Sequence, residues 1–276
     1  MADIGKKNSL RIVKAVDFGV YLDGGRHGEI LLPRRYLPKT WVVGDKLDVF
    51  IYLDTEDKLI ATTQRPRIVV GQCAHLKVKA VNDFGAFLDW GLSKDLLVPF
   101  SEQTTRMKEG NDYVVYCYLD EDTDRIAATT KLHEYLDEYG DDLEPGQAVS
   151  LLICGRTDMG YKAVINNTHL GLIFKGDAFK PLKYGMKLDG YIKAIREDGK
   201  IDLCLQLPGQ EAKKELADQI LDHLKAEGGV SGLTDKSVPE DIYEKFNVSK
   251  SSYKKALGAL YKRRMIVIEK DQIKLV

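Results

Sequence analysis

The sequence predicts a mainly β, multidomain protein in which three small five-stranded barrels are followed by a compact helical domain. One pattern of residues occurs three times, in 10–64, 76–131 and 149–206. Within each copy, apolar and polar residues alternate with a period of two, which is typical of half-buried strands. After the third copy, the apolar residues change to the spacing of α-helices. A chain of 276 residues is long enough for several small domains.

Each copy carries the same events in the same order. An alternating strand leads to a glycine and a second strand, and a turn then leads to a short apolar strand. A polar connection follows, then a fourth strand, a charged turn and a fifth strand. The glycines that end the polar connection are Gly44, Gly110 and Gly185. Five short strands in about 55 to 60 residues fit a closed barrel of the OB type.

The tail begins with three predicted helices. The first covers 210–226, with apolar residues at Leu216, Ile220, Leu221 and Leu224. Pro239 fits the first turn of a second helix that ends near Phe246. Ser249 is the expected N-cap of a third helix, which runs to about Lys262. The residues expected on the apolar face of that helix are Tyr253, Ala256, Leu257, Leu260 and Tyr261.

The last twelve residues, "MIVIEKDQIKLV", predict a β-hairpin that turns at Lys270 and Asp271. Three helices followed by a hairpin form a winged helix-turn-helix. We therefore expect domains at 1–68, 69–133, 145–207 and 208–276, the first three being barrels. The acidic segment 134–144 is expected to be a helical or flexible linker.

Composition excludes several classes of protein. The net charge is −1, from 41 basic and 42 acidic residues, so the chain is not a uniformly basic nucleic-acid binder. The second barrel segment and the linker are acidic and the other segments slightly basic, which leaves room for local basic patches. No apolar run reaches the roughly 18 residues of a membrane span, and the N-terminus lacks the apolar core of a signal peptide. We therefore expect a cytoplasmic protein without membrane contact.

The cysteines and histidines give no sign of a metal or cofactor. The four cysteines, Cys73, Cys117, Cys154 and Cys204, are scattered without a C-x-x-C motif, and we expect buried thiols. No group of His, Cys, Asp and Glu has the spacing of a zinc site. We predict neither a metal nor a cofactor.

The phrases "DFGVYLD" and "DFGAFLD" place an aromatic residue on each side of a glycine. Residues three apart in a regular strand point to opposite faces, but a bulge at the glycine would bring both rings to one face. Phe84 and Phe87, and equally Phe18 and Tyr21, would then form outward platforms on which unpaired bases stack. The alternative is that these rings close the barrel ends or pack between domains.

Basic residues near these rings are candidates for phosphate contacts. In the first copy they are Lys14, Arg26, Arg34, Arg35 and Lys58. In the second copy they are Lys77, Lys79, Lys94 and Arg125.

The stretches "DFGAFLD", "LLVPFSE" and "DRIAATTK" resemble the S-one domain, the RNA-binding repeat of a large ribosomal protein. The resemblance implies that the stacking aromatics of this family fall on Phe84, Phe87, Phe18 and Tyr21. It also implies that the basic residue before the last strand falls on Arg125 and Lys58. The third copy departs from the pattern, with Met159 and Lys162 in place of the ring pair. Its remaining candidates for exposed rings are Tyr161 and Phe174.

The whole order of domains resembles the bacterial conserved virulence factor B family. The most specific part is "LTDKSVPEDIYEKFNVSKSSYKKALGALYKRRMI" in the tail. The resemblance implies a cytoplasmic RNA-binding protein that influences gene expression, without an assigned enzymatic activity.

The third helix of a winged helix usually enters a nucleic-acid groove. Its candidate contacts here are Lys250, Lys254, Lys255, Lys262, Arg263 and Arg264. The alternative interpretation is a solvated basic face.

The resulting hypothesis is a non-catalytic, monomeric protein that binds single-stranded RNA, and duplex nucleic acid through the winged helix. It needs no small-molecule substrate. Two alternatives stay open: a DNA-binding regulator led by the winged helix, and a protein-docking scaffold that uses the same aromatic residues. An enzyme is not favoured, since the sequence has neither a G-x-x-x-x-G-K-[ST] nor a G-x-G-x-x-G phosphate loop and its paired carboxylates fall in charged turns.

Overall fold

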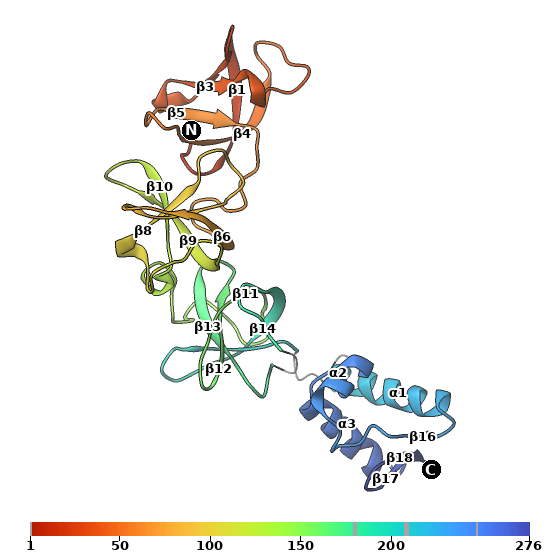
Figure 1. Ribbon diagram of the computed structural model, residues 1–276. Helices are drawn as coiled ribbons and strands as arrows, with labels where there is room; N and C mark the ends of the chain where they lie inside the picture. The colour runs from red at the N-terminus through yellow and green to blue at the C-terminus, as the bar shows by residue number, and fades with distance from the viewer. Residues whose placement is uncertain (1, 179–180, 207–209, 247) are drawn as a thin grey trace. The chain divides into compact units, whose positions relative to one another are not determined.

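In the described part of the chain, three closed five-stranded barrels precede a region of three α-helices and a small sheet (Figure 1). This computed structural model describes residues 2–178, 181–206, 210–246 and 248–276. The architecture confirms the predicted fold class. The chain divides into two compact units, Met1–Leu136 and Asp137–Val276. The first unit holds two barrels, and the second holds the third barrel and the helical region, while the finer domain boundaries stay predictions.

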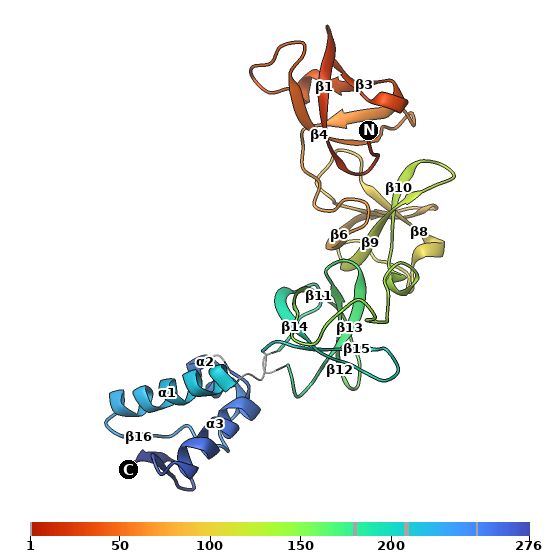
Figure 2. The same ribbon diagram turned by 180° about the vertical axis from the view of Figure 1, so that it is seen from behind.

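The strands of the three barrels follow one plan. The first barrel consists of β1 (Lys7–Val16), β2 (Gly19–Asp23), β3 (Glu29–Pro33), β4 (Lys46–Leu53) and β5 (Leu59–Thr62). The second consists of β6 (Cys73–Val81), β7 (Gly85–Leu88), β8 (Leu96–Pro99), β9 (Asp112–Asp120) and β10 (Arg125–Thr129). The third consists of β11 (Ala148–Arg156), β12 (Gly160–Ile165), β13 (His169–Phe174), β14 (Lys187–Ile195) and β15 (Ile201–Cys204), the last of which is labelled in Figure 2. In every barrel the third and fifth strands pair in parallel and the other neighbours are antiparallel. The short 3-10 helices are η1 (Gly25–His27), η2 (Arg34–Tyr36), η3 (Phe100–Glu102) and η4 (Leu132–Glu134).

A β-bulge interrupts the first strand of each barrel. In β1 the register shifts between Ile12 and Lys14, and β6 and β11 shift at the equivalent place. The glycine of the polar connection docks at this bulge: the N–H of Gly44 donates to the carbonyl of Ile12 at 2.9 Å. Gly44 has a φ of 105°, a conformation that favours glycine. The repeated glycine therefore fixes the point at which the first strand stops pairing with the fourth strand and begins to pair with the second.

The glycine between the two aromatic residues has a different role from the predicted one. The bulge lies in the strand before it, so the expectation of a bulge at the glycine itself is wrong. A Cβ on Gly19 would lie 2.2 Å from the carbonyl oxygen of Leu32, and one on Gly160 would lie 2.0 Å from that of Ile173. The glycine is thus needed because the second strand begins directly against the backbone of the third.

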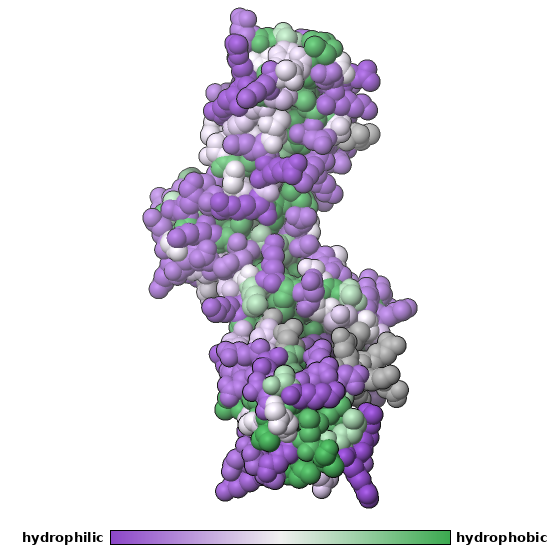
Figure 3. Space-filling model, turned by 90° about the vertical axis from the view of Figure 1, so that its right-hand side faces the viewer, coloured by the Kyte–Doolittle hydropathy of each residue, from purple (hydrophilic) through white to green (hydrophobic). Residues whose placement is uncertain are grey.

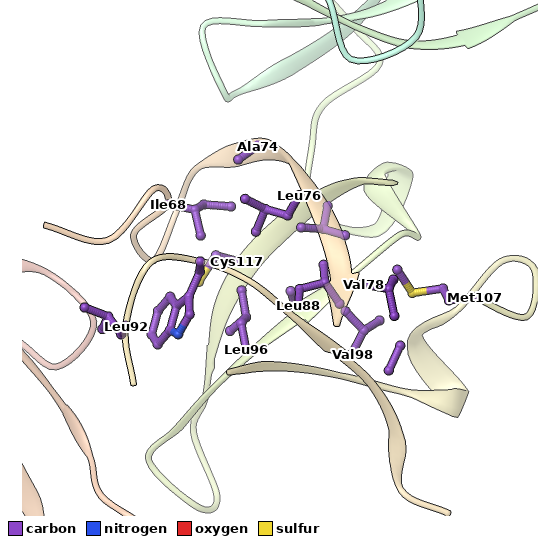
Figure 4. Close-up of a cluster of buried hydrophobic side chains, with 14 of the residues drawn as sticks. Ile68, Ala74, Leu76, Val78, Leu88, Leu92, Leu96, Val98, Met107 and Cys117 are labelled. Atoms are coloured by element: carbon purple, nitrogen blue, oxygen red, sulfur yellow. The ribbon is translucent and has the colours of Figure 1, made fainter. Parts of the chain in front are cut away.

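Apolar side chains from all five strands fill each barrel. In the second barrel Leu76, Val78, Leu88, Leu96 and Val98 point into a common interior (Figure 4). Each of these side chains is at most 2% exposed. Because alternate residues of each strand face inward, their neighbours in sequence are turned outward and form the barrel surface.

The two barrels of the first unit share part of their core. Phe50 of β4 packs with the second-barrel cluster, its ring centroid 5.6 Å from that of Trp90. The Lys94 ammonium donates to the carbonyls of Leu53 and Asp54, at 3.1 and 2.7 Å. Burial lowers the pKa of Lys94. A lysine of the second barrel thus caps the end of a first-barrel strand.

Replacing Lys94 by methionine is expected to lower the free energy of unfolding of the first unit by about 1–3 kcal/mol, because two carbonyls lose a charged donor. Trp41 and Trp90 place one fluorophore in each barrel, so urea unfolding followed by tryptophan fluorescence measures the change. Lys77→Met, at an exposed position of β6, is the control and should stay within about 0.5 kcal/mol of wild type. Equal losses in both variants would contradict the role of Lys94.

The acidic segment before the third barrel is not a free linker. Tyr139 pairs in antiparallel fashion with Lys200, and the N–H of Gly140 donates to the carbonyl of Gly199 at 3.1 Å. Glu138 forms an ion pair with Lys200, and Leu143 packs against the barrel core. The expectation of a helical or flexible segment is therefore wrong for 137–144. Its apolar residues, which an acid count overlooks, attach it to the barrel.

The C-terminal region is a winged helix. Its helices are α1 (Gln210–Ala226), α2 (Pro239–Phe246) and α3 (Lys250–Lys262). The Ser249 side chain accepts the N–H of Ser252 at 3.0 Å and caps α3, as predicted. Strands β17 (Ile266–Ile268) and β18 (Ile273–Leu275) form the predicted hairpin. A short strand that the sequence did not predict, β16 (Val230–Ser231), pairs with β18 and completes the sheet.

One residue of α3 lies on a different face from the predicted one. Tyr253, Leu257 and Leu260 are buried, but Tyr261 is 57% exposed. Tyr261 is seven residues after Lys254, so both lie on the same outer face of the helix. No α-helix in the described part of the chain is long and apolar enough to cross a membrane.

His223 is expected to make the stability of the winged helix dependent on pH. The ring packs edge-on against Phe246 and lies 3.2 Å from the Ser231 hydroxyl. Burial, with a smaller contribution from Lys245, lowers the pKa of His223. The unfolded chain therefore takes up this proton more readily than the folded one, and stability falls as pH drops below about 6.5.

We expect the free energy of unfolding of the winged helix to decrease between about pH 7.5 and 5.5, and His223→Gln to flatten that decrease. Circular dichroism at 222 nm follows this domain, because it holds all the α-helices of the described residues. His27→Gln, in the first barrel, should leave the dependence unchanged. An unaltered slope in His223→Gln would exclude His223 as its origin.

Candidate nucleic-acid interface

Phe18 and Tyr21, the first platform, lie on the outside of the first barrel. Phe18 occupies the turn between β1 and β2 and is 58% exposed. Tyr21 points outward from β2 and is half-buried. Their ring centroids are 6.4 Å apart at an interplanar angle of 81°. The rings therefore meet edge to face, and the exposed one is Phe18.

Two cations flank the first platform. The Lys14 ammonium lies 4.6 Å from the centroid of the Tyr21 ring and 2.5 Å from Glu29, whose hydrogen bond raises the pKa of Lys14. The backbone N–H of Arg34 donates to the carbonyl of Phe18 at 2.8 Å, so the exposed Arg34 follows the platform directly. Lys58 lies in the turn between β4 and β5 and pairs with Glu56 at 2.7 Å.

Phe84 and Phe87, the second platform, take the same positions in the second barrel. Phe84 is 74% exposed, in a turn held by the Asn82 side chain, which accepts the Phe84 N–H at 2.9 Å. Phe87 points outward from β7, opposite Ala80 and Leu97, and is half-buried. A solvent-exposed phenylalanine in the same turn of two barrels is the main observation for a stacking surface.

The cations predicted for the second barrel differ in their ion-pair partners. Lys79 occupies the bulge of β6 and pairs with Asp95 at 2.8 Å. Lys77, two residues earlier in β6, is exposed. Arg125 forms an ion pair with Asp57 of the first barrel, which lowers the pKa of that carboxyl. Arg125 is thus directed at the neighbouring barrel, and an RNA contact from it stays a prediction.

Sequence reasoning missed one aromatic residue of the second barrel. Phe100 follows Pro99, which pairs with Gly85, and is half-buried. The guanidinium of Arg106 lies 3.8 Å from the centroid of the Phe100 ring. Both residues stand in or just after the quoted motif "LLVPFSE", which was the available signal.

Among its described residues, the third barrel has no equivalent pair of rings. At the two ring positions it carries Met159, 56% exposed, and the exposed Lys162. Tyr161 is half-buried against the barrel core, with the Arg156 guanidinium 5.9 Å from its ring centroid, and an RNA contact from it stays a prediction. It follows the glycine directly, a position that faces inward in all three copies. Phe174 is half-buried, with the Arg196 guanidinium 5.2 Å from its ring centroid.

The cations of the winged helix lie along α3 and just after it. Lys250 donates to the carbonyl of Lys236 at 3.3 Å, and Lys254 lies 3.8 Å from Asp235. The exposed members of the group are Lys254, Lys255, Lys262, Arg263 and Arg264. Together with the exposed ring of Tyr261 they give this helix a basic, partly aromatic outer face.

Figure 3 shows one side of the molecule, where hydrophilic residues cover most of the surface and apolar residues form smaller areas among them.

The thiols of the described residues are buried or half-buried. Cys73, Cys117 and Cys204 are buried and Cys154 is half-buried. Burial raises the pKa of Cys117 to about 12 and that of Cys154 to about 11, so both are protonated at neutral pH. Among the residues that the structure describes, no three His, Cys, Asp or Glu side chains gather as a metal site.

Family models match both kinds of domain. The S1 domain, the S-one domain of the sequence analysis, matches residues 4–64 and 70–131. The CvfB-like winged helix domain matches residues 218–275. These matches agree with the barrels and the winged helix of the structure and support a role in nucleic-acid binding.

Individual relatives extend the similarity over most of the chain. The Bacillus subtilis protein YitL is 30% identical over 284 aligned residues, which cover 96% of this chain and 91% of YitL. Conserved virulence factor B of Staphylococcus saprophyticus is 27% identical, with 84% of this chain and 80% of the relative covered. A crystal structure of a multidomain protein with nucleic acid binding domains from Streptococcus pneumoniae aligns with a TM-score of 0.42 and 24% identity, over 99% and 98% of the two chains. The chain therefore belongs to the conserved virulence factor B family, with S1 barrels followed by a CvfB-like winged helix.

Proposed function

We propose that this protein binds single-stranded RNA on the first and second platforms and acts without catalysis in the regulation of gene expression. The observation that carries the proposal is the pair Phe18 and Phe84, at 58% and 74% exposure in equivalent turns of two barrels. An exposed aromatic ring lacks the favourable free energy that burial of its apolar surface would contribute. A base that stacks on the ring covers this surface and recovers that free energy.

The platforms suit unpaired bases rather than a duplex. In a duplex the base faces are already stacked, and an outside ring meets only edges and phosphates. Phe18 and Phe84 are exposed to solvent, and Lys14, Arg34 and Lys79 lie on the same barrels for phosphates. The choice of RNA over single-stranded DNA rests on the S1 match of both barrels.

The winged helix supplies a second set of contacts in this proposal. The exposed cations of α3 attract phosphates, while Tyr261 beside them offers a ring. Several weak sites on one chain raise the overall affinity through effective concentration. In this proposal the protein is also cytoplasmic and monomeric and has no small-molecule substrate.

Fluorescence anisotropy with labelled single-stranded RNA and with duplex DNA of equal length tests the proposal over a range of salt concentrations. We expect the RNA to bind more tightly. Lys254→Ala/Lys255→Ala should lower the slope of log affinity against log salt by about 1.4, since two phosphate contacts are lost. The control, Lys225→Ala/Lys245→Ala, changes lysines of α1 and α2 and should leave the slope unchanged.

Two outcomes would favour the alternatives. A preference for duplex DNA that depends on Lys254 and Lys255 would indicate a DNA-binding regulator. An absence of nucleic-acid binding even at low salt would indicate a protein-docking scaffold.

A further inference from the structure

The third barrel carries a pocket at the site where the other two barrels carry their rings. Its volume is about 260 Å³, and both ring-position residues, Met159 and Lys162, line it. Drug-sized ligands occupy pockets of about 300–1,000 Å³, so this pocket suits one small ligand rather than a length of strand. The third barrel thus carries a half-open hollow where the other two carry an exposed ring pair.

The floor of the pocket is apolar. Leu172 lies opposite Lys162 on β12 and Asp202 on β15, which turns its side chain to the outside of the barrel. Leu170, two residues earlier on β13, faces the same way and is 8% exposed. Met159 forms a flexible apolar wall beside them. This floor suits a flat, weakly polar group such as a nucleobase.

The added segment 137–144 builds one side of the pocket. Glu138 lines it and forms an ion pair with Lys200, and the Tyr139 ring centroid lies 5.2 Å from the Lys200 ammonium. Arg196, which also lines the pocket, pairs with Asp202 at 2.6 Å. Both of these cations are therefore already neutralised by carboxylates of the same barrel.

Lys162 differs from the other two cations of the pocket. It is exposed, and no carboxylate pairs with it among the described residues. A phosphate would supply the missing partner through charge-assisted hydrogen bonds. The rim also holds Asp198, an exposed carboxylate whose oxygen accepts the Lys200 N–H at 3.1 Å. A carboxylate of this kind accepts hydrogen bonds from ribose hydroxyls.

We propose that this pocket binds a single nucleotide, with its base on Leu170 and Leu172 against Met159, its phosphate at Lys162 and its ribose at Asp198. The inference goes beyond strand stacking and uses no residue of the first or second platform. Two ligands offer this combination of base, ribose and phosphate: a free nucleoside 5′-monophosphate and the 5′-phosphorylated end of an RNA.

Isothermal titration of the full chain with AMP, adenosine and inorganic phosphate tests the proposal. We expect saturable AMP binding, about tenfold or more tighter than that of adenosine or phosphate alone, because only AMP reaches both the floor and Lys162. Lys162→Glu should weaken AMP binding by about tenfold or more, since it replaces attraction with repulsion. Lys187→Glu, an exposed change on β14 away from the pocket, is the matched control and should bind AMP like wild type.

A second titration identifies the source of the nucleotide. It uses Phe18→Ala/Phe84→Ala protein, which lacks the exposed platform rings, and an RNA decamer with either a 5′-phosphate or a 5′-hydroxyl. Tighter binding of the phosphorylated decamer, lost in the added Lys162→Glu change, supports an RNA end as the ligand. Failure of both AMP and the phosphorylated decamer to bind in a Lys162-dependent way would overturn the pocket proposal. Stacking on the platforms would be untouched by that result, because wild-type binding to long single-stranded RNA measures it separately.

Discussion

Replacing Phe18 and Phe84 together by alanine is expected to weaken the binding of single-stranded RNA by at least about 30-fold. Each base stacked on an aromatic side chain contributes about 1–3 kcal/mol, so two lost stacks remove about 2 kcal/mol or more. Both rings are mainly exposed, at 58% and 74%, and their removal leaves the barrel cores intact. Anisotropy titration with a labelled RNA long enough to reach both barrels measures the loss.

The control for this double variant truncates exposed apolar side chains elsewhere on the first barrel. Val42 and Val43 are 64% and 54% exposed in the connection between β3 and β4. Val42→Ala/Val43→Ala should bind RNA like wild type. RNA binding that falls equally in both double variants would point to a general loss of apolar surface rather than to the platforms.

Gly160→Ala is expected to destabilise the third barrel by more than about 4 kcal/mol, a loss that few single substitutions produce. The new Cβ would lie 2.0 Å from the carbonyl oxygen of Ile173, and both atoms belong to paired backbone strands that cannot move apart without losing their hydrogen bonds. The same methyl group at Gly176, three residues further on from Ile173, meets no heavy atom within 4 Å. Gly176→Ala is therefore a matched control within the same barrel.

Hydrogen exchange followed by mass spectrometry resolves this effect by segment. Peptides from β11 to β15 should lose their protection in Gly160→Ala and keep it in Gly176→Ala. Peptides of the first unit should exchange alike in both variants. Retained protection of β12 and β13 in Gly160→Ala would show that the strands can separate to admit a side chain.

The repeat and its period-two alternation were sufficient to predict the barrels, because inward and outward positions are a local property of each strand. The same local argument fails at strand ends. Phe18 and Phe84 stand in turns, where alternation no longer applies, and the bulge lies in the strand before the glycine. Tyr161, the first strand residue after its glycine, is half-buried against the barrel core, because the alternation of the strand still applies there.

Contacts between distant segments could not be predicted from one sequence. Asp57 and Arg125 are 68 residues apart, and their ion pair depends on how the first two barrels meet. The attachment of Tyr139 to Lys200 likewise depends on an open position beside β15. Tyr261 was misplaced because it borders the apolar stripe of α3, where the 100° step between residues carries it to the outer face.

The candidate site was predictable in its residue types but not in its geometry. Sequence spacing indicated two rings on each of the first two barrels, and the structure turns one ring of each pair well into solvent. The spacing could not show that Arg125 forms an ion pair with Asp57. Nor could it show that the Arg106 guanidinium lies over the ring of Phe100. Both features depend on side-chain directions that neither composition nor spacing specifies.

The most direct test of stacking on the platforms uses Phe84→Trp, which places an indole at the most exposed ring position. Trp90 is 3% exposed, and subtraction of the wild-type signal removes the contribution of both native tryptophans. Stacking of a base on the new indole should quench its fluorescence, and the quenching should saturate at the same RNA concentration as the anisotropy of labelled RNA. Saturating anisotropy with unchanged indole fluorescence would contradict the account, because the RNA would then bind without covering the platform.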